Sequence, residues 1–243
     1  MALDGLVVHS LASELHTKLV GGKVDKVHQP ENDELVLFIR NNKENFKLVL
    51  SSSASNPRVY IANEYKKENP IKAPMFCMLF RKYIQGGNIV EISQIGFERI
   101  IKISVESLDE LKEKTVKNIM IEIMGRHSNI IITHGEENKI IDSIKRVPFS
   151  ISRVRQVLPG HDYSLPPEQN KLNPLDNISK DLFIKNLEEL EGPIFKSIYS
   201  KFLGISPIIA KEICYRAGVN QNAIIKDISD EQFDALHKVF CNL

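Results

Sequence analysis

A proline-rich stretch from Pro148 to Asn173 divides the sequence into two parts that differ in hydrophobic periodicity. Before it, short runs rich in Val, Ile and Phe alternate with turn-forming segments, a pattern typical of antiparallel β-strands. After it, apolar residues recur at helical spacing. We therefore expect an α+β protein in which residues 1–172 form an antiparallel-sheet domain and residues 173–243 form an all-helical domain.

The first part is expected to open with a helix and to continue with strands. The apolar residues between Val8 and Leu19 fall on one helical face, with Asp4 placed to cap the helix and Gly21 to end it. A short apolar helix is expected from Pro74 to Ile84, because Pro suits its start. The predicted strands cover residues 23–28, 35–40, 46–50, 58–62, 89–95, 99–105, 116–124 and 129–133, and the first three are predicted to form an antiparallel meander.

The second part contains a helix, a tight turn and a second helix. Gly204 permits a positive backbone angle, Ser206 is placed to cap a helix, and Pro207 suits the first helical position. The predicted helices cover residues 182–190, 194–202, 208–217 and 230–240. Two interpretations of the turn stay open. Free N–H groups at a helix start can hold a nucleic-acid phosphate, or the Gly and Pro only fix the path of a plain helical hairpin.

Composition limits the class of protein without naming a partner. A formal net charge of +1 does not indicate nucleic-acid binding, which needs a local basic surface. The segment from Lys145 to Arg155 is the clearest such excess, although a solvated face is the more common meaning of such a run. No secretory signal or membrane-spanning run is evident, and Cys77, Cys214 and Cys241 fit no zinc spacing, so we expect a cytoplasmic protein.

Catalytic signals are absent from the sequence pattern. The seven histidines have no metal-ligand spacing, and there is neither a Gly-rich phosphate loop nor a nucleophile elbow. We therefore expect neither an enzyme nor a bound cofactor.

Two polar pairs lie where binding residues are often displayed. Glu98 and Arg99 sit at a predicted strand junction, and Arg126 and His127 sit in a loop between two apolar strands. An ordinary surface pair and a polar hairpin turn are the alternatives.

Several segments, read together, resemble the NFACT family, which includes ribosome-associated quality-control factors and bacterial proteins named for fibronectin binding. They cover nearly the whole chain and are far more specific together than singly. The segments are Leu3-Asp4-Gly5, Val24-Asp25-Lys26-Val27-His28-Gln29-Pro30, Asn56-Pro57-Arg58, Phe76-Cys77-Met78-Leu79-Phe80-Arg81-Lys82 with Gly86-Gly87, Gly96-Phe97-Glu98-Arg99, Met124-Gly125-Arg126-His127-Ser128-Asn129, and Val157-Leu158-Pro159-Gly160 with Tyr163, Pro166 and Pro167.

The resemblance implies a fold and a role. It implies an N-terminal domain similar to that of formamidopyrimidine-type DNA glycosylases, followed by a helix-hairpin-helix domain. A coiled coil and an RNA-binding domain normally come later, so this chain is expected to be an N-terminal part. Members bind large ribosomal subunits that carry peptidyl-tRNA. They recruit aminoacylated tRNA, alanyl-tRNA in bacteria, for template-free tailing of the stalled chain, while the ribosome performs the bond-forming chemistry.

The resemblance also implies site residues. The family's early acid and Asp-Arg pair fall on Asp4, Glu98 and Arg99, with Glu98 in place of the usual Asp. Arg99 is expected to pair with phosphate or to stack on an unpaired base. We expect further contacts with tRNA from the basic or loop residues Arg126, His127, Arg153 and Arg155.

Two other functions are weighed against tRNA binding. A fibronectin-binding surface adhesin is suggested by names used within the family, and the lack of a signal peptide speaks against it as the primary role. A DNA glycosylase would need the N-terminal proline amine that those enzymes use, whereas this sequence has Ala2 and Leu3.

Overall fold

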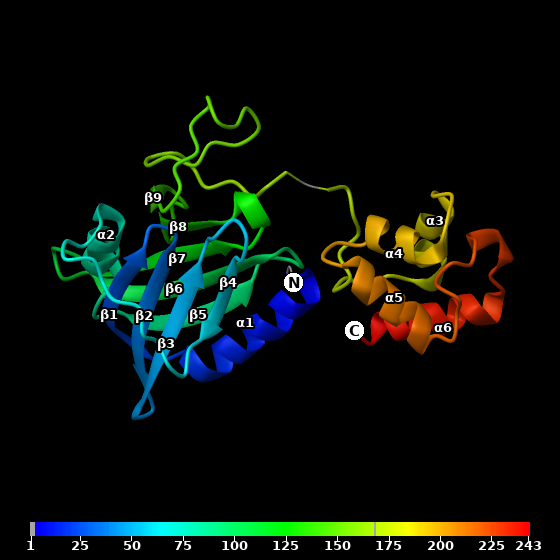
Figure 1. Cartoon of the computed structure of the whole chain (residues 1–243), viewed down its shortest axis with the longest axis horizontal. Coiled ribbons are helices and arrows are strands. Elements are labelled where there is room, and N and C mark those ends of the chain that lie inside the picture. Colours follow the sequence, from blue (N-terminus) through cyan, green and yellow to red (C-terminus); the bar gives the residue numbers. More distant parts are fainter. Residues whose placement is uncertain (1–2, 168) are drawn as a thin grey trace. The chain divides into compact units, whose positions relative to one another are not determined.

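The computed structural model describes residues 3–167 and 169–243, so Ala2 lies outside the described residues. The chain divides into two compact units (Figure 1). Unit 1 holds Leu3, Val8–Ile95 and Arg99–Pro167. Unit 2 holds Asp4–Val7, Gly96–Glu98 and the described residues from 169 to 243. The predicted boundary followed residue 172, and the short pieces from the first hundred residues that cluster with unit 2 were not foreseen.

Unit 1 is built on a nine-stranded sheet with the order β4-β3-β2-β1-β5-β6-β7-β8-β9. Every neighbouring pair is antiparallel. The first three predicted strands form the expected meander, and β1 also pairs with β5 through Lys23 and Asn88. The strands are β1 (Lys23–Glu31), β2 (Glu34–Asn41), β3 (Glu44–Ser51), β4 (Arg58–Ile61), β5 (Asn88–Gln94), β6 (Ile100–Leu108), β7 (Lys114–Glu122), β8 (Asn129–His134) and β9 (Ile140–Ser143).

Alternate side chains of the sheet enter different cores, because successive strand residues point to opposite faces. On β6, Ile101 and Ile103 join the main core of unit 1, whereas Ile100 belongs to a smaller cluster on the other face. That cluster also contains Val157 and Tyr163, so the segment after β9 covers the outer face of β6 to β8.

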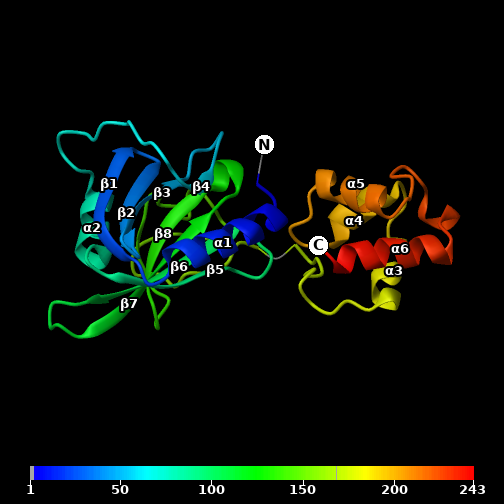
Figure 2. The ribbon, with the colours of Figure 1, turned by 90° about the horizontal axis from the view of Figure 1, so that it is seen from below.

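Two helices complete the main core of unit 1. One face of α1 (Gly5–Leu19) contributes its buried apolar side chains from Val8 to Leu19, and α2 (Met75–Ile84) contributes Phe76, Cys77, Phe80 and Ile84. In Figures 1 and 2, α1 runs along the sheet and α2 lies beside β1. Both helices were predicted, and Gly21, with a φ of 85°, follows α1 as expected.

From residue 169 onward, unit 2 contains the α-helices α3 (Lys180–Glu188), α4 (Ile194–Lys201), α5 (Pro207–Arg216) and α6 (Asp230–Cys241), with a short 3-10 helix at Ile225–Asp227. Serine side chains cap three of them. Ser179, Ser206 and Ser229 accept hydrogen bonds from the backbone N–H three residues later, which satisfies donors that a helix start leaves free. The helices surround a core with stacked phenylalanines, and Phe183 and Phe202 have ring centroids 5.2 Å apart.

The turn between α4 and α5 has the predicted geometry. Gly204 has a φ of 68°, Ser206 caps α5, Pro207 is its first residue, and Gly218 follows it with a φ of 67°. β9 was not predicted, since its four residues include Asp142 and Ser143 and carry only a weak strand pattern. Cys77 and Cys214 are buried and free, and no helix of the described residues is long and apolar enough to cross a membrane.

Candidate nucleic-acid interface

The register of three strands gathers several predicted site residues at one end of unit 1. Ile100 pairs with Glu122, and Glu122 pairs with Asn129. The start of β6, the end of β7 and the start of β8 therefore lie side by side. Arg99 directly precedes β6, and its carbonyl accepts a hydrogen bond from the backbone N–H of Ile123 at 2.8 Å. We call this edge, with Arg99 and the β7–β8 loop, the basic end of unit 1.

The β7–β8 loop holds its backbone in a fixed turn that displays two side chains. Gly125 has a φ of 59°, and the Ser128 hydroxyl accepts a hydrogen bond from the backbone N–H of Met124 at 2.7 Å. Arg126 and His127 project from this turn and are exposed. The Nε of Arg126 donates to the Nε2 of His127 at 3.0 Å, which leaves the other guanidinium N–H groups available for a ligand.

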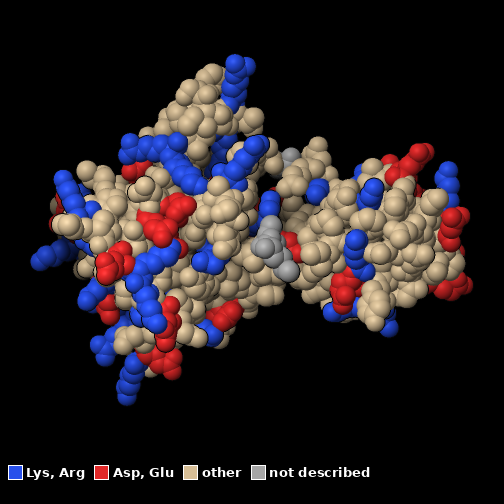
Figure 3. Space-filling view, viewed as in Figure 1, with Lys and Arg blue, Asp and Glu red and all other residues tan. Residues whose placement is uncertain are grey.

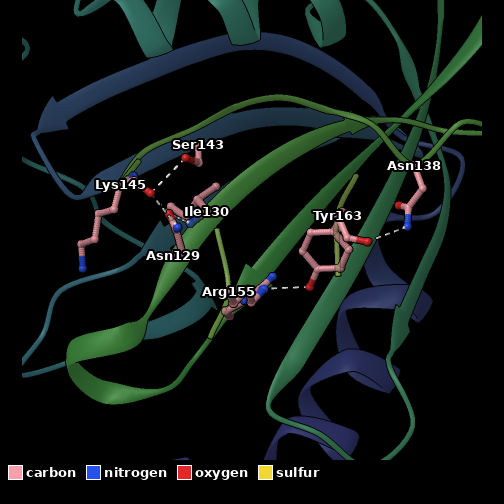
Figure 4. A network of polar contacts seen from close by, with 8 residues as sticks. Asn129, Ile130, Asn138, Ser143, Lys145, Arg155 and Tyr163 are labelled. Atoms are coloured by element: carbon pink, nitrogen blue, oxygen red, sulfur yellow. Dashed lines mark hydrogen bonds and ion pairs between the residues drawn. The ribbon is translucent and has the colours of Figure 1, made fainter. Parts of the chain in front are cut away.

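Lys145 joins both halves of the sheet at the basic end. Its Nζ donates to the carbonyls of Ser52, which follows β3, and Ser128, which precedes β8. Its backbone carbonyl accepts from Asn129 Nδ2 at 2.8 Å and from the Ser143 hydroxyl at 2.9 Å (Figure 4). Burial lowers the pKa of Lys145, and nearby Asp33 opposes that effect. The lysine therefore links the end of β3 to the start of β8.

Arg155 is held in a buried ion pair. Its guanidinium donates to both carboxylate oxygens of Glu122 at 2.7 and 3.0 Å, and the Tyr163 hydroxyl donates to the same carboxylate at 3.0 Å. The Arg155 side chain is 13% exposed and that of Glu122 is 2% exposed. Burial alone would lower the pKa of Arg155, but the Glu122 carboxylate outweighs it and the pKa is raised. Figure 4 shows Arg155 beside Tyr163, whose ring centroid lies 5.0 Å from the guanidinium carbon.

The arginines of the 145–155 segment thus differ in their partners. Arg146 makes two contacts with Asp142, at 2.9 and 2.8 Å, and Arg155 is paired with Glu122. Arg153 is exposed, and within the described residues it lies in no ion pair. In Figure 3, Lys and Arg side chains gather at the base of the segment that projects from unit 1. Arg126 and Arg153 are the predicted site residues best placed to meet a phosphate.

In unit 2, Asp4 lies against the α4–α5 turn. Its Oδ1 accepts from the backbone N–H of Val7 at 3.0 Å, as predicted for a cap, and its Oδ2 accepts from the Ser206 hydroxyl at 2.6 Å. The backbone N–H of Gly5 donates to the Gly204 carbonyl at 2.8 Å. This turn is therefore engaged by the chain's own N-terminal segment, which favours the plain-hairpin interpretation over a phosphate site.

Glu98 belongs to unit 2, where its neighbour Phe97 packs beside the α4–α5 turn. A Cβ built on Gly5 would lie 2.5 Å from the Phe97 carbonyl oxygen, and one built on Gly204 would lie equally close to it. Phe97 is 2% exposed and belongs to the core of unit 2. The structure thus brings the Asp4 segment and the Glu98 segment together. Glu98 is half-buried and interacts with other groups of the protein.

Sequence reasoning missed the partners that decide these roles. Glu122 and Tyr163 hold Arg155, and Ser206 holds Asp4. Each pairing joins residues that are distant along the chain, so no local motif reports it. Among the residues that the structure describes, no group of three or more His, Cys, Asp or Glu side chains could hold a metal ion.

A family model described as NFACT N-terminal and middle domains matches residues 4–243. The chain belongs to the NFACT family. It is 44% identical over 220 residues, 90% of this chain, to the Rqc2 homolog RqcH of Bacillus subtilis. It is 38% identical over 214 residues, 88% of the chain, to the RqcH of Streptococcus suis. The chain spans 38% of the length of each of these two relatives.

Solved structures of two similar proteins share the fold. The N-terminal part of a fibronectin/fibrinogen-binding protein from Streptococcus suis aligns with a TM-score of 0.83 and 34% identity, over 98% of this chain and 84% of that one. A fibrinogen-binding protein from Staphylococcus aureus aligns with a TM-score of 0.82 and 33% identity, over 100% of this chain and 82% of that one. Glycosylases reach TM-scores of only 0.41 to 0.45, and the predicted glycosylase-like fold stays a prediction. The predicted helix-hairpin-helix domain also stays a prediction.

Proposed function

We propose that this NFACT chain is the tRNA- and ribosome-binding part of a ribosome-associated quality-control factor. It would bind tRNA, alanyl-tRNA in particular, and large ribosomal subunits that carry peptidyl-tRNA, in support of template-free alanine tailing. The membership of the family and the relatives named Rqc2 homolog RqcH support this role. The chain binds and positions RNA in this proposal, and the bond-forming chemistry belongs to the ribosome.

The observation that carries the proposal is the basic end of unit 1. Arg99, Arg126 and Arg153 come from three separate segments that converge there, and the last two are exposed. No ion pair to a carboxylate involves Arg126 or Arg153 within the described residues. Their positive charge is therefore available to phosphate oxygens, which supply much of the affinity in RNA binding.

In this proposal the predicted residues have unequal roles. Arg155 and Asp4 act as supports in the proposal, since each is held by partners within the chain. Arg99, Arg126 and Arg153 contact phosphate, with His127 beside Arg126. Glu98 keeps its place next to Arg99 and offers a carboxylate to donors on the RNA.

Filter binding of labelled tRNA tests the proposal. Wild type is compared with Arg99→Ala, Arg126→Ala and Arg40→Ala at several salt concentrations. Arg40 is a matched control, because it is exposed and lies at the end of β2 opposite Glu34. Glu34 pairs with Ser51, next to the Ser52 carbonyl that Lys145 contacts at the basic end. We expect a steep loss of affinity with salt, a slope lower by about one unit for Arg126→Ala, and no change for Arg40→Ala.

Three results would count against this proposal. The first is salt-independent binding, the second is an Arg40→Ala effect as large as that of Arg126→Ala, and the third is no tRNA binding by folded wild type. Circular dichroism and thermal unfolding establish that each variant is folded.

A second candidate function is fibronectin binding. It is favoured by the printed names of solved relatives, which describe fibronectin- or fibrinogen-binding proteins. This role requires the protein to be found outside intact cells while cytoplasmic markers are absent there. Immobilised fibronectin should then retain the chain at physiological salt, and a lack of retention excludes this candidate.

A further inference from the structure

We propose that the loop of residues 148–154, the projecting loop, clamps an unpaired RNA nucleotide by stacking Phe149 on its base while Arg153 meets its phosphate. This deepens the proposed RNA binding and rests on it. Phe149 is 61% exposed, and two more apolar side chains of the loop, Ile151 and Val154, are 71% and 75% exposed.

The base of the projecting loop is fixed on both sides. The backbones of Val147 and Val157 exchange two hydrogen bonds, at 3.0 and 2.9 Å. Just inside that bridge, Arg155 is clamped by Glu122. The loop therefore rises from the basic end of unit 1 on a rigid stem.

The tip of the projecting loop is ordered by its own hydrogen bonds. The Pro148 carbonyl accepts from the backbone N–H groups of Ile151 and Ser152 at 2.9 and 3.1 Å. The Ser152 hydroxyl in turn accepts from the N–H groups of Val154 and Arg155. A loop braced in this way holds its apolar side chains in solvent, so little ordering entropy is lost when a ligand covers them.

The positive charge of the projecting loop and its stem favours RNA as the ligand. No acidic residue occurs from Ser143 to His161, and Arg153 adds an exposed positive charge to the same loop as Phe149. An unpaired nucleotide offers both a flat face and a phosphate, and stacking on aromatic side chains is the usual way in which proteins hold such bases.

Another exposed apolar residue of unit 1 shows the contrast. Leu111 is 80% exposed, but its turn between β6 and β7 also contains the carboxylates of Asp109, Glu110 and Glu113. That turn lies at the other end of β6 and β7 from Ile100 and Glu122. With Lys112 as the only cation among these three carboxylates in the turn, Leu111 is a matched control for apolar exposure in net acidic surroundings.

The test measures the binding of two probes, intact tRNA and a single-stranded oligouridylate. The proteins are wild type, Phe149→Ala, Phe149→Leu, Phe149→Tyr, Arg153→Ala and Leu111→Ala. We expect Phe149→Ala and Phe149→Leu to weaken binding about ten-fold, while Phe149→Tyr retains it, because stacking needs a ring. Arg153→Ala should lower the salt slope by about one unit, and Phe149→Ala should leave the slope unchanged.

The outcomes separate this inference from the proposed function. If Phe149→Ala binds tRNA as tightly as wild type does, the stacking role is overturned and the proposed tRNA binding stands. Full binding by Phe149→Leu also overturns stacking, since it indicates a plain apolar contact. Ring-dependent binding of oligouridylate without tRNA binding supports the loop and rejects the proposed function. No binding to either probe overturns both.

Discussion

Arg153 and Arg155 stand two residues apart and have different surroundings. Arg153 faces solvent, whereas Arg155 is enclosed between Glu122 and Tyr163. Burying both charges costs desolvation energy, which two hydrogen bonds and a third from Tyr163 offset. The removal of one partner then leaves the other charge buried and unpaired.

We predict that Arg155→Ala lowers the free energy of unfolding by about 3 kcal/mol, because Glu122 keeps a buried carboxylate without its cation. Arg153→Ala should unfold close to wild type, as expected for an exposed side chain. Urea denaturation of both variants checks this. Equal stabilities of the two would mean that the Glu122 pair contributes nothing.

A second residue-scale prediction concerns pH and His28. Burial, with Arg81 and Lys26 nearby, lowers the pKa of His28 below 6.5. Asn69 Nδ2 can only donate to His28 Nδ1, at 3.0 Å, so this contact requires the neutral ring. A lowered folded-state pKa adds stability above the unfolded pKa, and this contribution is lost as the pH falls through 6.5 toward the folded value.

We therefore expect the unfolding free energy of wild type to fall more between pH 7.5 and about 5.5 than that of His28→Gln. Urea denaturation at several pH values between these limits measures it. Parallel curves for the two proteins would contradict the role assigned to His28.

At the scale of elements, the α4–α5 turn of unit 2 depends on close packing as well as on backbone conformation. Gly204 and Gly218 have nearly equal φ angles, 68° and 67°. A Cβ on Gly204 would lie 2.5 Å from the Phe97 carbonyl oxygen, while one on Gly218 would meet nothing within 4 Å. Alanine substitutions at these two glycines therefore separate the energetic cost of backbone strain from that of steric overlap.

We predict that Gly218→Ala costs about 1 kcal/mol of stability, from the left-handed backbone alone. Gly204→Ala should cost at least about 2 kcal/mol more, because Phe97 and Gly5 must move. Thermal unfolding of the two variants gives the difference, and equal melting temperatures would show that the packing of this turn is loose.

The elements show what the sequence could and could not reveal. The start of α5 could be predicted, because Ser206 and Pro207 are local signals of a helix start. Most strands were readable from apolar runs, whereas the four-residue β9 was not. The link that Lys145 makes to Ser52 and the pairing of Arg155 with Glu122 depend on residues far away along the chain. The run of basic residues was therefore only a candidate binding surface, and its pattern did not show which of its members are committed to structure.

At the scale of the whole molecule, each compact unit has its own core, and the predicted site residues divide between the units. Asp4 and Glu98 belong to unit 2, and Arg99, Arg126, His127, Arg153 and Arg155 belong to unit 1. We propose that the basic end of unit 1 is the surface that meets RNA.

Hydrogen exchange of the chain with and without tRNA tests that claim most directly. We expect slower exchange in residues 125–128 and 148–155 when tRNA is bound, and no change in the β6–β7 turn at residues 109–113, which lies at the other end of these strands. Protection of residues 109–113 instead, with none at the basic end, would contradict the account.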